Sequence, residues 1–303
     1  MKIISPITMT DAILTSSNVP ETDYDEWDVS TTYATGDYVI STSSHKVYQS
    51  AVSSNLGNDP TTDDGSNWTE ISSTNRWKAF DSTISDQVSK SGSITYSISP
   101  ASLVTGIAFF GLDASEVRVQ VFDTESPANE IFDTTTSLVD TGEIVDWFTF
   151  FTTDLTDYDT EAQFVGIPAY AGYQIDITVG DGTGTAKVGL IALGRVIEIG
   201  KTLDGTSVGI TDFSIKEQND FGILSIVERG FADKTSFQFS LPTDDVRRVK
   251  RVLTSLRATP AVYFADEDLT QMGATVFGYY DDFEIPLSAG GVSIATLEIK
   301  GLI

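Results

Sequence analysis

Short runs in which polar and apolar residues alternate recur along the chain, and they constrain its fold more than any other feature. Successive side chains of a β-strand point to opposite faces, so each run fits a strand with one buried and one solvated face. The clearest runs are residues 93–99, 116–122, 172–179 and 292–300. Residues 103–110 are almost continuously apolar, as expected of a central buried strand. The pattern predicts an all-β fold of sandwiches or barrels.

One segment, about 244–257, has the period of a helix instead. Its apolar residues recur at spacings of three and four and form a single stripe. They are Val246, Val249, Leu253 and Leu256. Thr243 is a candidate N-cap, because a threonine hydroxyl there can accept a hydrogen bond from the first turn. We therefore expect one amphipathic helix in the C-terminal third.

The chain is strongly acidic, which excludes several partners. Its 303 residues carry 44 Asp+Glu and 18 Lys+Arg, a net charge of −26. Such a charge disfavours nonspecific binding to nucleic acid or to an anionic membrane, so we predict neither as a partner. No apolar run approaches the roughly 20 residues of a membrane span. The first residues lack the apolar region of a secretory signal, so we also expect no export.

Basic residues gather in the last third of the chain. Residues 201–303 hold 10 of the 18, and five of these lie on or at the end of the predicted helix. The simplest interpretation is a solvated helix face. The sharper hypothesis is that this face contacts an acidic neighbouring subunit.

The chain has no cysteine and one histidine, so its catalytic and metal-binding repertoire is narrow. Disulfides, thiolate metal sites and multi-histidine centres are excluded. The acidic loop 154–161 holds carboxylates that Ca²⁺ could use, but its spacing matches no EF-hand, and we interpret it as solvated. Residues 180–185 lack the lysine and helix of a phosphate loop, so we predict a hairpin turn. We expect no cofactor and no metal site.

Composition and patterning divide the chain into four parts. We expect an N-terminal arm at 1–22, a compact aromatic module at 23–73, a jelly-roll-like β-sandwich at 74–200, and a β-rich domain with one helix at 201–303. A module of about 50 residues has little core volume, so a few aromatic side chains must supply most of its burial. Trp27, Tyr48 and Trp68 are candidates for that core.

Five features of the aromatic module follow in a fixed order. They are Trp27, the motif Tyr33-x-x-Gly36-Asp37-x-Val39, the strand around Tyr48-x-Ser50, Asn58-x-Pro60 and Trp68. The series resembles the small carbohydrate-binding modules of families 5 and 12, which are found on chitinases and cellulases. The resemblance implies a three-stranded fold and a sugar-stacking platform of exposed aromatic rings. Carried onto this chain, the platform candidates are Tyr33, Tyr38 and Trp68, with Tyr48 as a weaker fourth.

Two further resemblances concern the rest of the chain. Residues 75–81 are similar to the beginning of discoidin-like jelly rolls of virion proteins. The order of strands and helix in 201–303, with its Val227-Glu-Arg-Gly230 segment and its end Leu297-Glu-Ile-Lys-Gly-Leu302, resembles tail-tip structural proteins of long-tailed bacteriophages. This resemblance implies a homo-oligomer that assembles with other tail and baseplate proteins.

The sequence contains no recognisable catalytic motif. Glycosidases need a carboxylate pair at a fixed separation, and no motif singles one out. A serine–histidine–aspartate triad would have to use His45, and no Gly-x-Ser-x-Gly elbow is present. We interpret His45 as a surface residue. We predict no catalytic residues and no enzyme activity.

The predicted function is a virion structural protein of a phage tail tip or baseplate, assembled in the bacterial cytoplasm, that binds host cell-surface polysaccharide during adsorption. Two alternatives stay open. The chain could be a polysaccharide-degrading enzyme with an accessory binding module. It could also be a tail scaffold whose small module docks another protein rather than a glycan.

Overall fold

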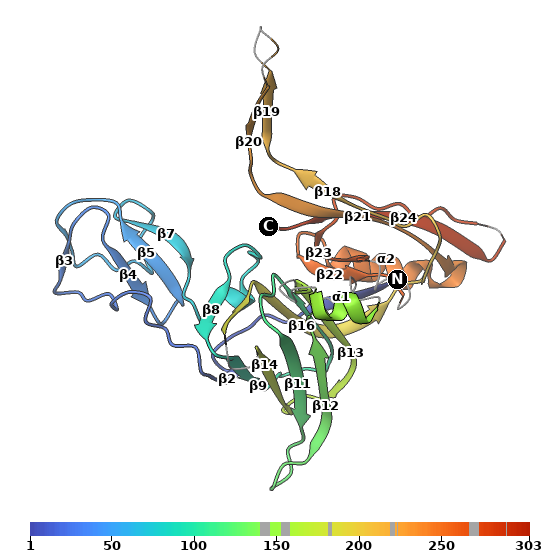
Figure 1. Ribbon diagram of the computed structural model, residues 1–303, viewed down its shortest axis with the longest axis horizontal. Coiled ribbons are helices and arrows are strands. Elements are labelled where there is room, and N and C mark those ends of the chain that lie inside the picture. The colour runs from blue at the N-terminus through green and yellow to red at the C-terminus, as the bar shows by residue number, and fades with distance from the viewer. Residues whose placement is uncertain are drawn as a thin grey trace.

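The computed structural model describes residues 1–139, 146–152, 158–180, 184–218, 222, 224–266, 273–288 and 290–303, without the side chains of residues 149, 150 and 152. Strands dominate the fold and confirm the predicted all-β class (Figure 1). Each alternating run forms a strand. The strands are β9 (Ile94–Ile98), β11 (Glu116–Phe122), β14 (Gln174–Val179) and β24 (Val292–Gly301), and the apolar run forms β10 (Val104–Phe110).

A five-stranded antiparallel sheet forms one layer of the central sandwich. Its order is β12 (Glu130–Ser137), β11, β14, β9 and β2 (Leu14–Ser17). The facing layer consists of β13 (Glu161–Ala169), β10 and β16 (Leu190–Glu198). Alternate residues of both layers, among them Val119, Ile177 and Phe109, are fully buried in one core. A separate pair is formed by β8 (Val88–Ser91) and β15 (Thr185–Val188).

The facing layer continues into the C-terminal region as one ten-stranded sheet. The path beyond β16 is β1 (Lys2–Pro6), β22 (Ala261–Phe264), β23 (Thr275–Tyr279), β24, β21 (Phe231–Pro242) and β17 (Lys201–Thr202), and β18 (Ser207–Asp212) also pairs with β21. The regions expected to divide at residue 200 therefore share a hydrogen-bonded sheet.

Residues 1–22, expected as an N-terminal arm, contain β1 and β2. β1 lies inside the ten-stranded sheet, where Lys2 pairs with Glu198 on one side and Phe264 on the other. Ile3 is buried in the C-terminal core, whereas Ile4 packs into a second cluster on the opposite face of the strand. β1 is thus the strand that joins the sandwich to the C-terminal region.

The predicted amphipathic helix is confirmed as α2 (Val246–Ser255), preceded by a 3-10 turn, η2 (Thr243–Asp245). Val249 and Leu253 are fully buried against the sheet. The expected Thr243 cap is absent, because the chain enters the helix through the 3-10 turn and Asp245 occupies the N-cap position. The Thr243 hydroxyl instead donates to the Ser288 carbonyl at 3.2 Å.

The aromatic module contains the expected three-stranded sheet, formed by β4 (Tyr38–Ser41), β5 (Lys46–Ser50) and β7 (Trp68–Ser73). A short pair, β3 (Thr32–Tyr33) and β6 (Asn55–Leu56), completes it. The module lies to one side of the other domains, at the left of Figure 1. After β7 the chain passes through a 3-10 turn, η1 (Lys78–Phe80), into the sandwich.

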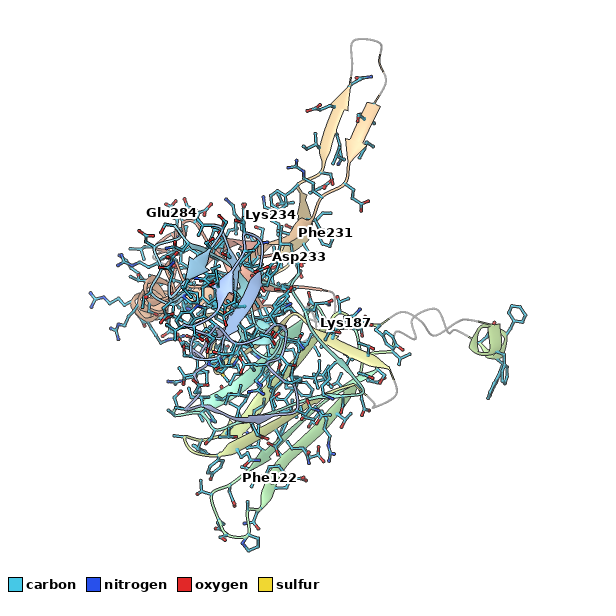
Figure 2. All side chains as sticks on the ribbon, turned by 90° about the vertical axis from the view of Figure 1, so that its left-hand side faces the viewer. Phe122, Lys187, Phe231, Asp233, Lys234 and Glu284 are labelled. Carbon is cyan, nitrogen blue, oxygen red and sulfur yellow. The ribbon has the colours of Figure 1, made fainter. Side chains whose placement is uncertain are left out.

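A two-stranded hairpin projects far from the body. Its strands are β19 (Ile215–Gln218) and β20 (Leu224–Val227), and within the described residues they pair only with each other. We call residues 213–230 the arm. Both views show it extending away from the domains (Figures 1 and 2), and Figure 2 shows Phe231 and Asp233 at its root. A short helix, α1 (Trp147–Thr152), exposes the rings of Trp147, Phe148 and Phe151.

Candidate carbohydrate-binding face of the small module

A tight turn at Gly36 and Asp37 orients the strand that carries Tyr38. Gly36 has a φ of 94°, a left-handed conformation that favours glycine. The Asp37 carboxylate accepts a hydrogen bond from the Ala34 amide at 2.7 Å and closes the turn. β4 therefore begins at Tyr38, and strand alternation places Tyr38 outside and Val39 inside the module.

Three of the four platform candidates lie inside the module. Tyr33, Tyr48 and Trp68 are exposed by only 9%, 7% and 2%, and they form one cluster with Val39. The Tyr33 and Trp68 rings meet edge to face, with centroids 5.2 Å apart. Trp68 Nε1 donates to the Asn58 carbonyl at 2.9 Å, which satisfies its buried polar group. These rings form the core and present no open face to a sugar.

The remaining candidate, Tyr38, is exposed and has a partner that the resemblance did not indicate. Tyr38 and Tyr24 stack with ring centroids 4.9 Å apart and an angle of 16° between their planes. Tyr24 is brought there because the chain beside it pairs with β4. The Ile40 amide donates to the Asp25 carbonyl at 3.0 Å, and the Trp27 amide donates to the Ile40 carbonyl at 2.9 Å. The two tyrosines form an exposed aromatic surface.

A hollow of about 540 Å³ adjoins this tyrosine pair. It is lined by residues 21–26 together with Tyr38 and Ile40. Three of its carboxylates have structural roles. Glu26 accepts from the Thr42 amide at 3.0 Å, Asp23 accepts from the Asn75 amide at 3.1 Å, and Glu21 accepts from the Thr74 hydroxyl at 2.7 Å. The Asp25 carboxylate has no hydrogen-bond or ion-pair partner among the described residues. An aromatic surface thus lies beside an acceptor that is free to bind a ligand.

His45 lies at the junction between the module and the sandwich, rather than freely on the surface. Its ring stacks on Trp77 at 4.0 Å, and Nδ1 lies 3.0 Å from a Glu21 carboxylate oxygen. Glu21 also accepts from the Thr74 hydroxyl at 2.7 Å and from Arg76 at 3.2 Å. The nearly buried Glu21 carboxylate therefore links the module to the start of the sandwich.

No family model matches the chain. No curated protein matches it either. The placement of Tyr24, Asp25 and Tyr38 is therefore the observation on which a binding site rests.

Among the described residues, no three His, Asp or Glu side chains gather closely enough to hold a metal ion. Asp154 and Asp157 of the acidic loop, and residues 181–183 of the expected hairpin turn, lie outside the described residues. Within the described chain, no helix is long and apolar enough to cross a membrane.

A second set of carboxyl groups lies near the root of the arm. Glu161 and Asp233 line a small cleft with apolar neighbours, including Phe110 and Phe231. Burial, followed by the charges of Asp233 and Asp159, raises the pKa of Glu161 to about 7. Burial also raises the pKa of Asp233. Burial thus shifts both carboxyl groups toward the protonated form relative to an exposed carboxyl group.

We expect the Glu161→Gln substitution to remove a pH dependence of stability. Below the ordinary pKa of glutamate, the Glu161 carboxyl group is protonated in both the folded and the unfolded protein, so its stabilising contribution is fully present. This contribution is lost as the pH rises through about 7. The variant should match the wild type at pH 4 and exceed its unfolding free energy by up to about 3 kcal/mol at pH 8. Urea unfolding across this range measures the difference. The exposed Glu284→Gln is the control, and a difference independent of pH would contradict the assignment.

Proposed function

We propose that this chain is a non-catalytic structural subunit of a phage tail tip or baseplate, and that its small module binds a cell-surface polysaccharide through Tyr24, Asp25 and Tyr38. The observation that carries the binding role is the exposed Tyr24–Tyr38 stack beside Asp25, whose carboxylate has no partner in the part of the chain that the structure describes. The resemblance of residues 201–303 to tail-tip proteins supports the virion role. The same resemblance supports a location in the virion after assembly in the bacterial cytoplasm.

The chemistry of the face suits a sugar. The C–H groups of a pyranose ring pack against a flat aromatic surface, and each such contact contributes about 1 kcal/mol. The Asp25 carboxylate accepts hydrogen bonds from sugar hydroxyls, and charge-assisted bonds of this kind are stronger than neutral ones. The tyrosine hydroxyls add further donors and acceptors at the rim.

A single face of this size binds weakly, so an assembled particle would gain from repetition. When several copies engage one polysaccharide, each further contact forms at a high effective concentration. We therefore expect weak binding by isolated subunits and strong binding by assemblies. A module that lies to one side of the other domains is suited to meeting a polymer outside the assembly (Figure 1).

Tyr24→Ala and Tyr38→Ala should each weaken polysaccharide binding about fivefold, and the double variant should abolish it at subunit concentrations that saturate the wild type. The measurement is a screen of bacterial polysaccharides with the chain immobilised at high density, followed by titration of each hit. Tyr170→Ala is the matched control, because Tyr170 is an exposed tyrosine outside the module. Binding that survives the double variant would place the glycan site elsewhere.

The acidic lining of the hollow favours one alternative, a docking site for a basic segment of another tail protein. Asp23, Asp25 and Glu26 all face this hollow. In that case Asp25→Asn would reduce assembly with the partner, and no polysaccharide would bind. The enzyme alternative predicts release of reducing sugar from a polysaccharide that binds the module.

A further inference from the structure

The His45 ring lies between two carboxylates from the chain that precedes the small module. Nδ1 lies 3.0 Å from a Glu21 oxygen, and Nε2 lies 3.1 Å from an Asp11 oxygen. His45 itself is in the turn between β4 and β5, whereas Asp11 is in the loop between β1 and β2. The ring therefore joins the small module to two separate points of residues 1–22.

Both contacts are attractive only when both ring nitrogens carry a proton. An ionised carboxylate only accepts hydrogen bonds, and a neutral imidazole has one N–H group and one bare nitrogen. A bare nitrogen 3.1 Å from the Asp11 oxygen would bring two lone pairs together. The imidazolium offers an N–H group on each side and a positive charge. The geometry around His45 thus corresponds to the charged form of the ring.

The two carboxylates differ in how much they depend on His45. Glu21 is nearly buried, and it also accepts from the Thr74 hydroxyl at 2.7 Å and from Arg76 at 3.2 Å. Asp11 is exposed, and within the described chain its carboxylate contacts no group other than Nε2. A buried acceptor is costly to leave without a donor, so a ring with one proton keeps it on Nδ1. Loss of the second proton therefore ends the contact with Asp11.

The other groups around the ring do not replace this contact. The ring stacks on Trp77 with centroids 4.0 Å apart, an arrangement that stabilises a cation over an aromatic face. Lys46, the next residue, pairs with Glu70 at 3.1 Å. Asp81 lines the same pocket of about 410 Å³, where burial raises the pKa of its carboxyl group. Among the described residues, neither Lys46 nor Asp81 forms an ion pair with the ring.

We propose that His45 is a proton-dependent latch, formed with Asp11 and Glu21, that fixes the orientation of the small module. The charged ring holds both carboxylates. When Nε2 gives its proton to water, Asp11 is released, and the module stays attached through Glu21, the Trp77 stack and the chain itself.

The direction of the pH response follows from which form of the ring is held. Histidine changes its charge between about pH 5 and 8. The contact with Asp11 is therefore present at the acid end of this range and is lost as the pH rises through it. The module then gains freedom of orientation while its own core is unchanged. This inference goes beyond the proposed function and does not depend on what the module binds.

A pair of spin labels tests the latch, because the chain has no cysteine of its own. Ser53→Cys in the module and Thr135→Cys on β12 are exposed labelling positions. The label-to-label distance should be narrowly distributed at pH 5.5. The population outside the narrow peak should rise about threefold at pH 8.5, the effect of losing one exposed ion pair. The single histidine reports its own protonation through its ring C–H resonances, so the two transitions should coincide.

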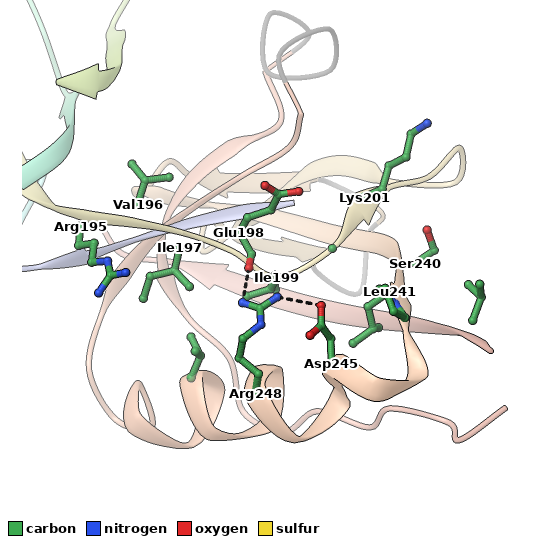
Figure 3. A pocket seen from close by; sticks show the side chains of 14 residues that line it. Arg195, Val196, Ile197, Glu198, Ile199, Lys201, Ser240, Leu241, Asp245 and Arg248 are labelled. Atoms are coloured by element: carbon green, nitrogen blue, oxygen red, sulfur yellow. Dashed lines mark hydrogen bonds and ion pairs between the residues drawn. The ribbon is translucent and has the colours of Figure 1, made fainter. Parts of the chain in front are cut away.

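Three variants show which group carries the response. Asp11→Asn should remove most of it, because a neutral amide can face either form of the ring. His45→Asn should remove all of it, and asparagine tolerates the left-handed φ of 57° at this position. Asp245→Asn is the matched control for Asp11→Asn. It breaks an exposed ion pair with Arg248, whose guanidinium stays charged throughout this range, so the response should persist (Figure 3).

Several results would overturn the latch. They are a wild-type distance distribution that is the same at both pH values, a transition that does not follow the histidine resonances, and a full response in Asp11→Asn. Burial raises the pKa of Glu161 to about 7, so Glu161→Gln should keep the response, and its loss there would assign the response to that cleft. Circular dichroism shows whether each variant is folded. Failure of polysaccharide binding would leave all these distances unchanged, so the two proposals fail separately.

Discussion

An Ile4→Asp variant should lose at least about 4 kcal/mol of unfolding free energy, because the new carboxylate would lie in an apolar cluster without a partner. Ile4 is fully buried and packs among residues from both regions that β1 joins, including Phe110 and Phe264. Neither the sandwich nor the C-terminal region can exclude the charge without losing pairing to β1. Urea unfolding, followed by fluorescence and circular dichroism, measures the loss.

The same variant tests whether the ten-stranded sheet behaves as one unit. We expect the wild-type sandwich and C-terminal region to unfold together, and Ile4→Asp to separate them into two transitions. Ser5→Ala on the same strand is the control, since Ser5 is only partly buried and should change stability by less than about 0.5 kcal/mol. A single transition at nearly unchanged urea concentration in Ile4→Asp would contradict the structural role of β1.

Trp68→Ala should destabilise the small module by about 3–5 kcal/mol, the usual loss for removing a large buried aromatic side chain. The substitution removes the edge-to-face contact with Tyr33 and leaves the Asn58 carbonyl without its indole donor. A module of this size has a small reserve of stability, so we expect it to unfold while the sandwich stays folded. Limited proteolysis between residues 23 and 73 and the near-ultraviolet circular dichroism spectrum detect this.

Comparing Tyr38→Ala with Trp68→Ala distinguishes an exposed residue of the proposed binding surface from a core residue. Tyr38 is exposed, so its replacement should leave the module folded and reduce only binding. If Trp68→Ala instead left the module folded and abolished polysaccharide binding, Trp68 would act as a sugar platform and its burial would have to change in solution.

Local patterning was sufficient to predict the most regular strands and the helix. The run at 116–122 coincides with β11, because strict alternation over seven residues fits a strand with one buried face. β1 could not be identified in this way. Its apolar residues Ile3 and Ile4 face opposite sides of a sheet, so they do not alternate, and the strands that bury them lie about 190 and 260 residues further along the chain.

Prediction from the sequence was similarly limited for the candidate binding face. The order of aromatic residues in 23–73 pointed to the right segment for a compact three-stranded module, but it did not separate core rings from exposed ones. Tyr33 and Trp68 are buried because a small module must use its largest rings as its core. Tyr24 lies outside the motif, and only its pairing beside Ile40 brings it onto Tyr38. The acidic run from Asp23 to Glu26 was the available signal, but it has no distinctive spacing.

The central position of β1 also determines how the chain would carry tension. A load applied to a polysaccharide on the small module reaches the rest of the chain through residues 18–22 and 74–77. This link is held by side-chain contacts at Glu21, His45 and Trp77, whereas β1 is hydrogen-bonded along both edges. We expect the link to yield at lower force than the sheet, so that the module swings toward the pull while the ten-stranded sheet stays intact.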